Sequence, residues 1–253
     1  MASPDDSLTT IQRGVEVIEI LLELEEAGPT EVAERMDLPV TTVYEYLRSI
    51  SETKFVNRRN GQYFLSSFFI TICGRMRHRN RLFQVAKPEM QRVAEETGEL
   101  VGLTIEDNGL AILLHQELGD QALELGTYPG TVTPLHALAN GKALLAHLPE
   151  EKVDEIVGDG QLEQWTAETI ADPERLRAEL SEIRSDGYAT DSDELVVGMG
   201  TIAVPIVVDD TVLGAVGIST PSQRIRREEY KSELLQELQE MRSRISINYQ
   251  YSS

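Results

Sequence analysis

Two short stretches near the N-terminus combine side chains that can bind a nucleic acid. Hydroxyl, phenol and guanidinium groups are closely spaced in "TTVYEYLR" (41–48), and a pair of arginines follows in "NRRNGQ" (57–62). Such groups can hydrogen-bond base edges or hold phosphates, and the residue types alone leave both roles open. The predicted DNA-binding residues are Thr41, Thr42, Tyr44, Arg48, Arg58 and Arg59.

A further stretch, "NGKA" (140–143), resembles a phosphate-binding loop but lacks its essential residues. The Walker pattern requires a glycine five positions before Gly141, where this chain has His136. The pattern also requires Ser or Thr after the lysine, and Lys142 is followed by Ala143. The sequence therefore argues against a nucleotide-binding enzyme.

Other catalytic and metal-binding motifs match the sequence even less well. A hydrolase that uses Ser219, His136 and Asp191 is one alternative, but "VGISTP" lacks the second glycine of a nucleophile elbow. The chain has one cysteine, Cys73, and four histidines, and their spacing matches no zinc site. We therefore expect a protein that is not an enzyme and that uses neither a cofactor nor a metal ion.

Hydrophobic periodicity indicates three helices in the N-terminal part. Apolar residues recur at helical spacing from Leu8 to Glu26, and Gly28-Pro29 is expected to end that helix. Thr30 would cap a short second helix. Thr41 or Thr42 would cap a third, because a threonine hydroxyl can accept a backbone N–H at a helix start.

A hairpin is expected directly after the third helix. Two β-prone runs flank Asn60-Gly61, and both central residues of a type I′ turn need positive φ. Three helices and a hairpin make a winged helix-turn-helix over residues 1–65, whose third helix would lie in the major groove of DNA. Winged helices also bind proteins, so a protein-binding adaptor with a ligand-sensing domain is the alternative.

The pattern changes after residue 65. A basic, helix-like segment over residues 66–83 predicts a linker helix, and residues 84–253 alternate strand and helix patterns. Antiparallel strands covered by helices make a domain built on one sheet, so the expected fold class is α+β. The expected strands are 100–105, 110–115, 122–125 and a hairpin about Asp209-Asp210, and the expected helices are 83–96, 135–157 with a break at Pro149, one from Asp172-Pro173 to about Gly187, and 228–247.

The net charge is large and negative. The chain has 43 acidic and 23 basic residues, a net charge of −20, and 18 of the basic residues are arginines. Dispersed carboxylates with few lysines predict a halophilic source, such as an archaeon, because concentrated salt screens self-repulsion within about 3 Å. An ordinary acidic cytosolic protein is the alternative.

Basic residues gather where the predicted DNA-binding residues lie. From Arg48 to Arg81 the chain has eight basic residues and one acid, Glu52, whereas residues 83–253 hold 13 basic and 31 acidic residues, a net charge of −18. This asymmetry predicts an anionic partner for the first part of the chain. No apolar run approaches the roughly 20 residues of a membrane span, and the first residues lack a secretion-signal pattern. A cytoplasmic protein with no membrane partner is expected.

Four blocks of the sequence resemble the IclR-type transcriptional regulators. They are "AERMDLPVTTVYEYLRSI" (33–50), "TPLHALANGKALLAHLP" (133–149), "IRSDGYATDSDELVVGMGTIAVPI" (183–206) and "AVGISTPSQRI" (215–225). The resemblance covers about Leu8 to Ile245 and implies a winged helix-turn-helix followed by a GAF-like α/β effector-binding domain. It also implies a homodimer or homotetramer that binds a pseudo-palindromic operator in double-stranded DNA. Such a regulator would repress or activate catabolic genes in response to a small effector, an organic acid or a sugar derivative.

The resemblance further implies where the effector binds. Ala139 and Asn140 match the start of the family's pocket helix, whose N–H groups suit an anionic group. Gly217 also fits close strand packing, and Asp191 also fits a cap or a turn. The implied effector-binding residues are Leu125, Ala139, Asn140, Asp191, Met199, Thr201, Gly217 and Ser219.

Overall fold

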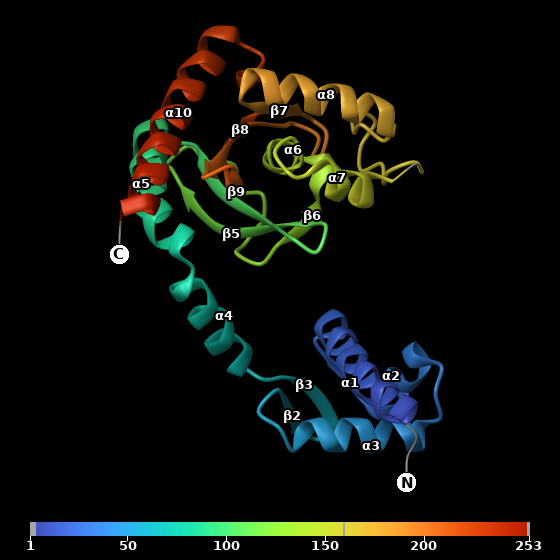
Figure 1. The fold of residues 1–253 in the computed structure, drawn as a ribbon. Helices are drawn as coiled ribbons and strands as arrows, with labels where there is room; N and C mark the ends of the chain where they lie inside the picture. The colour runs from blue at the N-terminus through green and yellow to red at the C-terminus, as the bar shows by residue number, and fades with distance from the viewer. Residues whose placement is uncertain (1–3, 159, 252–253) are drawn as a thin grey trace. The chain divides into compact units, whose positions relative to one another are not determined.

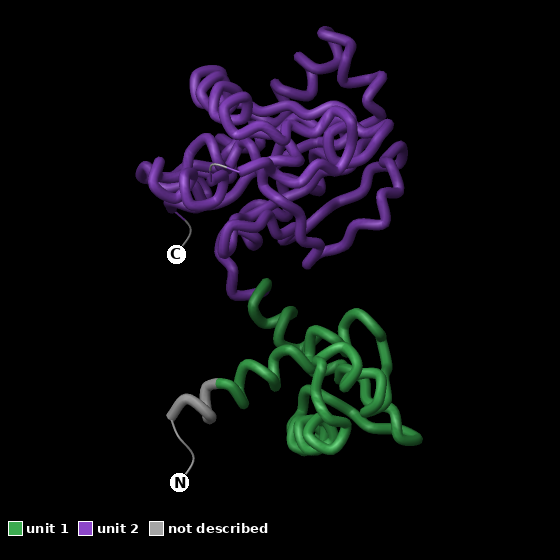
Figure 2. The backbone as a smooth tube through the Cα atoms, turned by 90° about the vertical axis from the view of Figure 1, so that its right-hand side faces the viewer, with its two compact units in different colours: residues 1–77 green, residues 78–253 purple. Residues whose placement is uncertain are grey.

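The computed structural model describes residues 4–158 and 160–251 (Figure 1). The chain divides into two compact units, residues 1–77 and 78–253 (Figure 2). The boundary lies inside the predicted linker segment, which forms α4 (Phe68–Arg79) and the first residues of α5 (Arg81–Thr97), so the helix expected over 83–96 begins two residues earlier. The helix breaks because Asn80 has an extended backbone and caps α5, where its side chain accepts the Phe83 N–H at 2.9 Å.

Unit 1 (residues 1–77) is the predicted winged helix-turn-helix. Its helices and its small sheet enclose a core in which Val17, Leu21, Val43, Leu47 and Tyr63 are 0 % exposed. Its elements are α1 (Pro4–Leu24), β1 (Glu26–Ala27), α2 (Pro29–Met36), α3 (Val40–Ser51), β2 (Val56–Arg59), β3 (Gln62–Leu65) and α4.

The expected threonine caps of α2 and α3 are wrong. Helix α2 begins at Pro29, and the Glu31 carboxylate accepts the N–H of the preceding Gly28 at 2.8 Å. Helix α3 begins directly after Pro39, because proline fixes φ and is tolerated at a helix start. Thr41 and Thr42 therefore lie inside the first turn of α3.

The end of α1 and the wing differ in part from the sequence prediction. The helix ends at Leu24, because Glu25 takes a positive φ of 63° and Glu26–Ala27 joins the wing as strand β1. The sheet order is β1-β3-β2. The hairpin between β2 and β3 turns at Asn60 and Gly61, whose φ values of 54° and 86° are those that a type I′ turn needs.

Unit 2 (residues 78–253) is built on a six-stranded antiparallel sheet with the order β6-β5-β4-β9-β8-β7. The predicted strand over 122–125 is wrong, because the open side of β5 bonds to the chain just before β6: Leu113 N–H donates to Thr131 O at 2.9 Å. The short edge strand β7 was not predicted. The strands are β4 (Leu100–Asp107), β5 (Leu110–Leu118), β6 (Val132–Pro134), β7 (Ala189–Ser192), β8 (Met199–Val208) and β9 (Thr211–Pro221).

Helices cover both faces of this sheet (Figure 1). Helices α5 and α10 lie side by side on one face, where Met90 and Leu238 are 0 % exposed. Helices α6 and α8 pack together on the other face, where Ala143 and Leu176 are 0 % exposed. None of the described helices is long and apolar enough to cross a membrane. The remaining helices are η1 (Leu135–Ala137), α6 (Ala139–Leu145), α7 (Glu150–Val157), α8 (Pro173–Asp186), α9 (Ser222–Ile225) and α10 (Glu228–Tyr251).

Candidate DNA interface and effector cavity

The exposed face of α3 carries three of the predicted DNA-binding residues. Thr41, Tyr44 and Arg48 are exposed and follow one another at i, i+3 and i+7, so they share one face of the helix. Thr42 is half-buried. Arg48 pairs with Glu45 at 3.1 Å, but both side chains are more than half exposed. Breaking this ion pair so that Arg48 can bind a phosphate or a base therefore costs little free energy.

Arg58 joins the wing to this face of α3. Its guanidinium lies 6.0 Å from the ring centre of Tyr44 on α3 and 5.3 Å from that of Tyr63, its cross-strand partner. Arg59 is the next residue of β2, and neighbouring side chains of a strand point to opposite faces. Arg59 stacks on Phe64 at 5.4 Å and is 72 % exposed. The two arginines therefore serve different surfaces of the wing.

The basic stretch from Arg48 to Arg81 is divided between the two units. Arg81 belongs to unit 2, where its guanidinium lies 4.8 Å from the ring centre of Tyr249 on α10. Arg75 is exposed on α4, within unit 1. The local positive charge of unit 1 therefore comes from fewer residues than the sequence suggested.

Unit 2 contains a cavity of about 80 Å³ between its sheet and the loops that follow β5 and β7. The cavity is lined by five of the eight implied effector residues: Leu125, Asn140, Met199, Thr201 and Ser219. Ala139, Asp191 and Gly217 are not among its lining residues.

Several polar lining residues were missed by sequence reasoning. Gln116 and Thr127 form two hydrogen bonds with each other. The Gln116 amide donates to Thr127 O, and the Thr127 hydroxyl donates to Gln116 Oε1, both at 2.8 Å. Thr131 and Thr133 also line the cavity, and their period-2 spacing before α6 was a usable signal that both face the same way. On the far wall the Thr201 and Ser219 hydroxyls are 3.0 Å apart. None of the described lining residues is charged.

Asn140 and Gly217 form one packing unit. The Asn140 amide donates to the Gly102 and Ala215 carbonyl oxygens, each at 3.3 Å, and so ties α6 to strands β4 and β9. A Cβ on Gly217 would lie only 2.3 Å from Asn140 Oδ1. Gly217 thus permits the close approach of Asn140, which agrees with the packing interpretation of this glycine.

The start of α6 is already occupied by a carboxylate. Asp191 Oδ2 accepts the Ala139 N–H at 2.8 Å, and Asp191 is only 2 % exposed. Burial raises the pKa of Asp191 to about 7, although the Ala139 N–H and Lys142 act in the opposite direction. The Ala139 N–H is therefore not available to an anionic ligand, contrary to the sequence-based expectation.

The residues of the hydrolase alternative have separate partners. His136 Nε2 contacts Glu163 O at 2.8 Å, whereas Ser219 bonds to Thr201 and Asp191 to Ala139. Among the described residues no group of three potential ligands is placed to hold a metal ion.

Lys142, the lysine of the apparent phosphate loop, is 0 % exposed and paired with two carboxylates. Its ammonium lies 2.5 Å from Glu179 and 2.7 Å from Glu194. Burial opposes the charge, but Glu194 and Glu179 raise the pKa of Lys142 above its ordinary value. Lys142 therefore has a structural role and is not placed to bind phosphate.

Comparison with known proteins identifies the family. Residues 10–60 match the IclR helix-turn-helix domain, and residues 75–247 match the family described as "Bacterial transcriptional regulator IclR C-terminal". The HTH-type transcriptional repressor AllR of Escherichia coli is 30 % identical over 241 residues, which cover 91 % of this chain and 89 % of AllR. A protein named "Probable HTH-type transcriptional regulator ArcR", from Halobacterium salinarum, is 25 % identical over 90 % of this chain and 88 % of its own.

Solved structures show the same fold over nearly the whole chain. The Thermotoga maritima IclR structure is 26 % identical, with a TM-score of 0.75, and covers 96 % of this chain and 100 % of its own. An IclR homologue from Microbacterium hydrocarbonoxydans, complexed with 4-hydroxybenzoate, is 24 % identical, with a TM-score of 0.80 over 96 % of this chain and 100 % of its own. The chain therefore belongs to the IclR family of DNA-binding transcriptional regulators, and it is not an enzyme.

Proposed function

We propose that this regulator controls catabolic genes, as a repressor or an activator, and that a small organic effector in the cavity of unit 2 changes its operator binding. The main support for this proposal is that five of the eight implied effector residues line one cavity. Threonines and the amide of Gln116, which the resemblance did not name, line the same cavity. The 4-hydroxybenzoate complex of the Microbacterium homologue supports a small organic ligand at this fold. Because an operator is cytoplasmic DNA, the proposal includes a cytoplasmic location.

For DNA binding, we assign α3 as the recognition helix. Thr41, Tyr44 and Arg48 on its exposed face would contact base edges in the major groove, and Thr42 would contribute from the margin. Arg58 and Arg59 on the wing would hold backbone phosphates on two sides of the hairpin.

The proposal also includes a homodimer, or a tetramer made of dimers, on a pseudo-palindromic operator. Apolar side chains are exposed on two helices of unit 1: Ile11 (66 %) and Leu22 (70 %) on α1, and Ile70 (74 %) and Met76 (67 %) on α4. Such exposed apolar residues favour association of two chains. A dimer with two-fold symmetry binds a DNA site that has the same symmetry. One winged helix alone buries little surface for tight, specific binding.

The cavity lining bears on the class of the effector. The candidate effectors are organic acids and sugar derivatives. The Ala139 N–H is bonded to Asp191, and the described lining residues carry no charge. Polar groups of the ligand would therefore bind the hydroxyls of Thr201 and Ser219 and the amide of Gln116, which favours a ligand that carries hydroxyl groups.

The experiment combines calorimetry with DNA binding. Wild-type chain is titrated with a panel of hydroxylated organic acids, including 4-hydroxybenzoate, and of sugar derivatives. Compounds that bind are then added to the chain bound to DNA from its own upstream region. Leu125→Trp should fill the cavity and abolish ligand binding while DNA binding without ligand stays unchanged. Leu123→Trp is the matched control, because Leu123 lies in the same loop outside the described lining. Ligand binding that survives Leu125→Trp would contradict the placement of the effector.

A further inference from the structure

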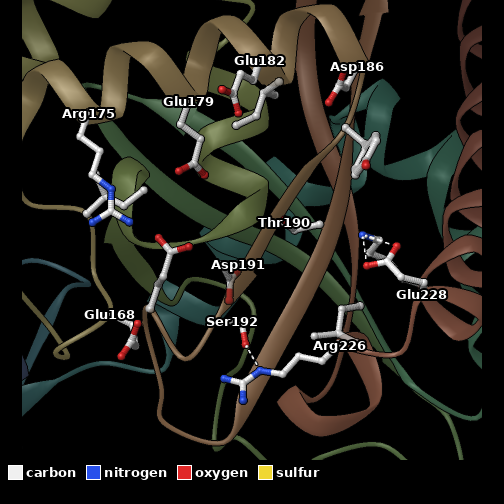
Figure 3. Close-up of a pocket in the computed structure, with 16 residues that line it drawn as sticks. Glu168, Arg175, Glu179, Glu182, Asp186, Thr190, Asp191, Ser192, Arg226 and Glu228 are labelled. Atoms are coloured by element: carbon white, nitrogen blue, oxygen red, sulfur yellow. Dashed lines mark hydrogen bonds and ion pairs between the residues drawn. The ribbon is translucent and has the colours of Figure 1, made fainter.

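Unit 2 has a second and larger cleft, of about 530 Å³, whose described lining residues do not overlap with those of the effector cavity (Figure 3). Its walls are α8 on one side and the start of α10 on the other. Residues 190–192 of the edge strand β7 lie between them. Nothing in the proposed function uses this cleft.

The cleft is strongly acidic. Seven of its described lining residues are acidic and three are basic. Two of the basic residues have close acidic partners: Lys231 lies 2.8 Å from Glu228, and Arg226 lies 2.6 Å from Asp193. Glu182 and Asp186, in contrast, have no ion-pair partner within the described part of the chain and are exposed. An excess of negative charge therefore remains in the cleft.

Two buried carboxylates at the floor of the cleft have unsatisfied oxygens. Asp191 is 2 % exposed and Glu194 is 8 % exposed. Asp191 Oδ1 and Glu194 Oε2 have no hydrogen-bond partner in the described structure. Burial raises the pKa of both carboxyl groups. Because a buried acceptor without a donor is costly, the floor favours a ligand that brings cationic donors.

The spacing of the wall carboxylates indicates the shape of that ligand. Glu179, Glu182 and Asp186 follow at i, i+3 and i+7 on α8, and Figure 3 shows all three on the side that faces the cleft. Side chains three or four positions apart on a helix are about 5–6 Å apart, so this row extends over roughly 10 Å. No three described carboxylates converge as the ligands of a metal ion do. A row of separate carboxylates suits a linear molecule with several separated charges.

We propose that this cleft binds a linear polyamine, whose ammonium groups pair with Glu182 and Asp186 on α8 and with Glu194 at the floor. The ammonium group fits because it offers three donors and a positive charge in a compact volume. Lys142 already binds one oxygen of Glu194 at 2.7 Å, so the ligand would bind the other oxygen, Oε2, which has no hydrogen-bond partner in the described structure.

The test is isothermal titration calorimetry of the full chain with spermidine, in about 0.1 M NaCl, where charges act over about 10 Å. The cleft variant is Glu182→Gln/Asp186→Asn, which changes only exposed side chains and so leaves the fold intact. The control variant is Glu150→Gln/Glu151→Gln, which removes the same net charge from exposed positions on α7. Circular dichroism verifies the fold of each protein.

The proposal predicts one spermidine site per chain in wild type and in the control. Binding to the cleft variant should be weaker by roughly tenfold, as expected for the loss of two exposed ion pairs. Butylamine, a monoamine, should bind more weakly than the diamine putrescine. The proposal is overturned if wild type shows no binding up to about 1 mM ligand, if both variants lose affinity equally, or if butylamine binds as tightly as putrescine.

Discussion

Asp191 accepts the backbone N–H of Ala139 at 2.8 Å, so a buried carboxylate from the edge strand β7 closes the start of α6. The next residue of that helix, Asn140, lines the effector cavity, whereas Asp191 lies at the floor of the acidic cleft. One hydrogen bond thus connects the effector cavity and the acidic cleft of unit 2. It also explains why the Ala139 N–H is not open to an anionic ligand.

We expect Asp191→Asn to remove part of the pH dependence of stability. Burial raises the pKa of Asp191 from its ordinary 3.8 to about 7, so between these values the folded state holds a proton that the unfolded state releases. This stabilisation is complete below about pH 4 and is lost as the pH rises through about 7, at roughly 1.4 kcal/mol per unit. The free energy of unfolding, measured with urea over this range, should fall more steeply for wild type than for the variant.

Asp186→Asn serves as the control for this experiment, because Asp186 is exposed on the neighbouring helix α8. The difference between the profiles of the two variants measures the part of the pH dependence that is specific to Asp191. If Asp191→Asn and wild type gave parallel profiles, Asp191 would not carry a proton in the folded protein near neutral pH.

Lys142→Met should strongly destabilise unit 2. The substitution leaves Glu194 buried without the ammonium that lies 2.7 Å away, and breaking a buried pair from one side costs about 3–5 kcal/mol. Lys152→Met is the matched control: Lys152 lies 2.6 Å from Glu106, but its side chain is 40 % exposed, so the expected cost is below about 1 kcal/mol. Urea unfolding measures both costs, and similar values for the two variants would show that the Lys142 cluster is not tightly coupled.

The contact between Asn140 and Gly217 predicts non-additive substitutions. Gly217→Ala places a methyl group 2.3 Å from Asn140 Oδ1 and should cost about 1–3 kcal/mol. Adding Asn140→Ala removes the atom that clashes, so the double variant should cost less than the sum of the two single variants. Gly102→Ala is a milder control, because its new methyl group would meet Leu113 at an ordinary 3.5 Å. Additive costs in the double-mutant cycle would refute this packing account.

Two arginine substitutions should separate base recognition from phosphate binding. Arg59→Ala, on the outer side of the wing, should weaken binding to all DNA sequences about equally. Arg48→Ala, on α3, should also relax the sequence preference, with a loss of about 1–3 kcal/mol on the operator. Arg177→Ala, a half-buried arginine of unit 2 that pairs with Asp154, should change neither property. Fluorescence anisotropy with operator and scrambled DNA measures both effects, and equal loss of preference in the Arg48 and Arg59 variants would disagree with the assigned roles.

Local signals in the sequence were sufficient for the turns and for several helix ends. Asn60-Gly61 and Asp209-Asp210 both turn hairpins with positive φ at each position. Asp172 caps α8 by accepting the Arg175 N–H at 2.7 Å, because a carboxylate followed by proline is a strong helix start. These features depend on neighbouring residues alone.

Features that depend on distant residues were beyond sequence reasoning. Strand β1 has two residues and exists only because Ala27 pairs with Tyr63. The bond between Asp191 and Ala139 joins residues 52 positions apart, so no spacing rule reveals it. The family resemblance placed Asp191 near the effector site, but only the packing of β7 against α6 shows that its carboxylate binds the helix.

A DNase I footprint of the full chain on its own upstream region tests whether a two-fold regulator binds DNA through α3 and the wing. We expect two protected half-sites whose centres are separated by one helical turn of about 10 base pairs, or by a multiple of it, with matching sequences in inverted orientation. Protection should disappear with scrambled half-sites at the same protein concentration. Uniform protection along the fragment, or protection of one isolated half-site at full affinity, would contradict a two-fold regulator that reads DNA through α3 and the wing.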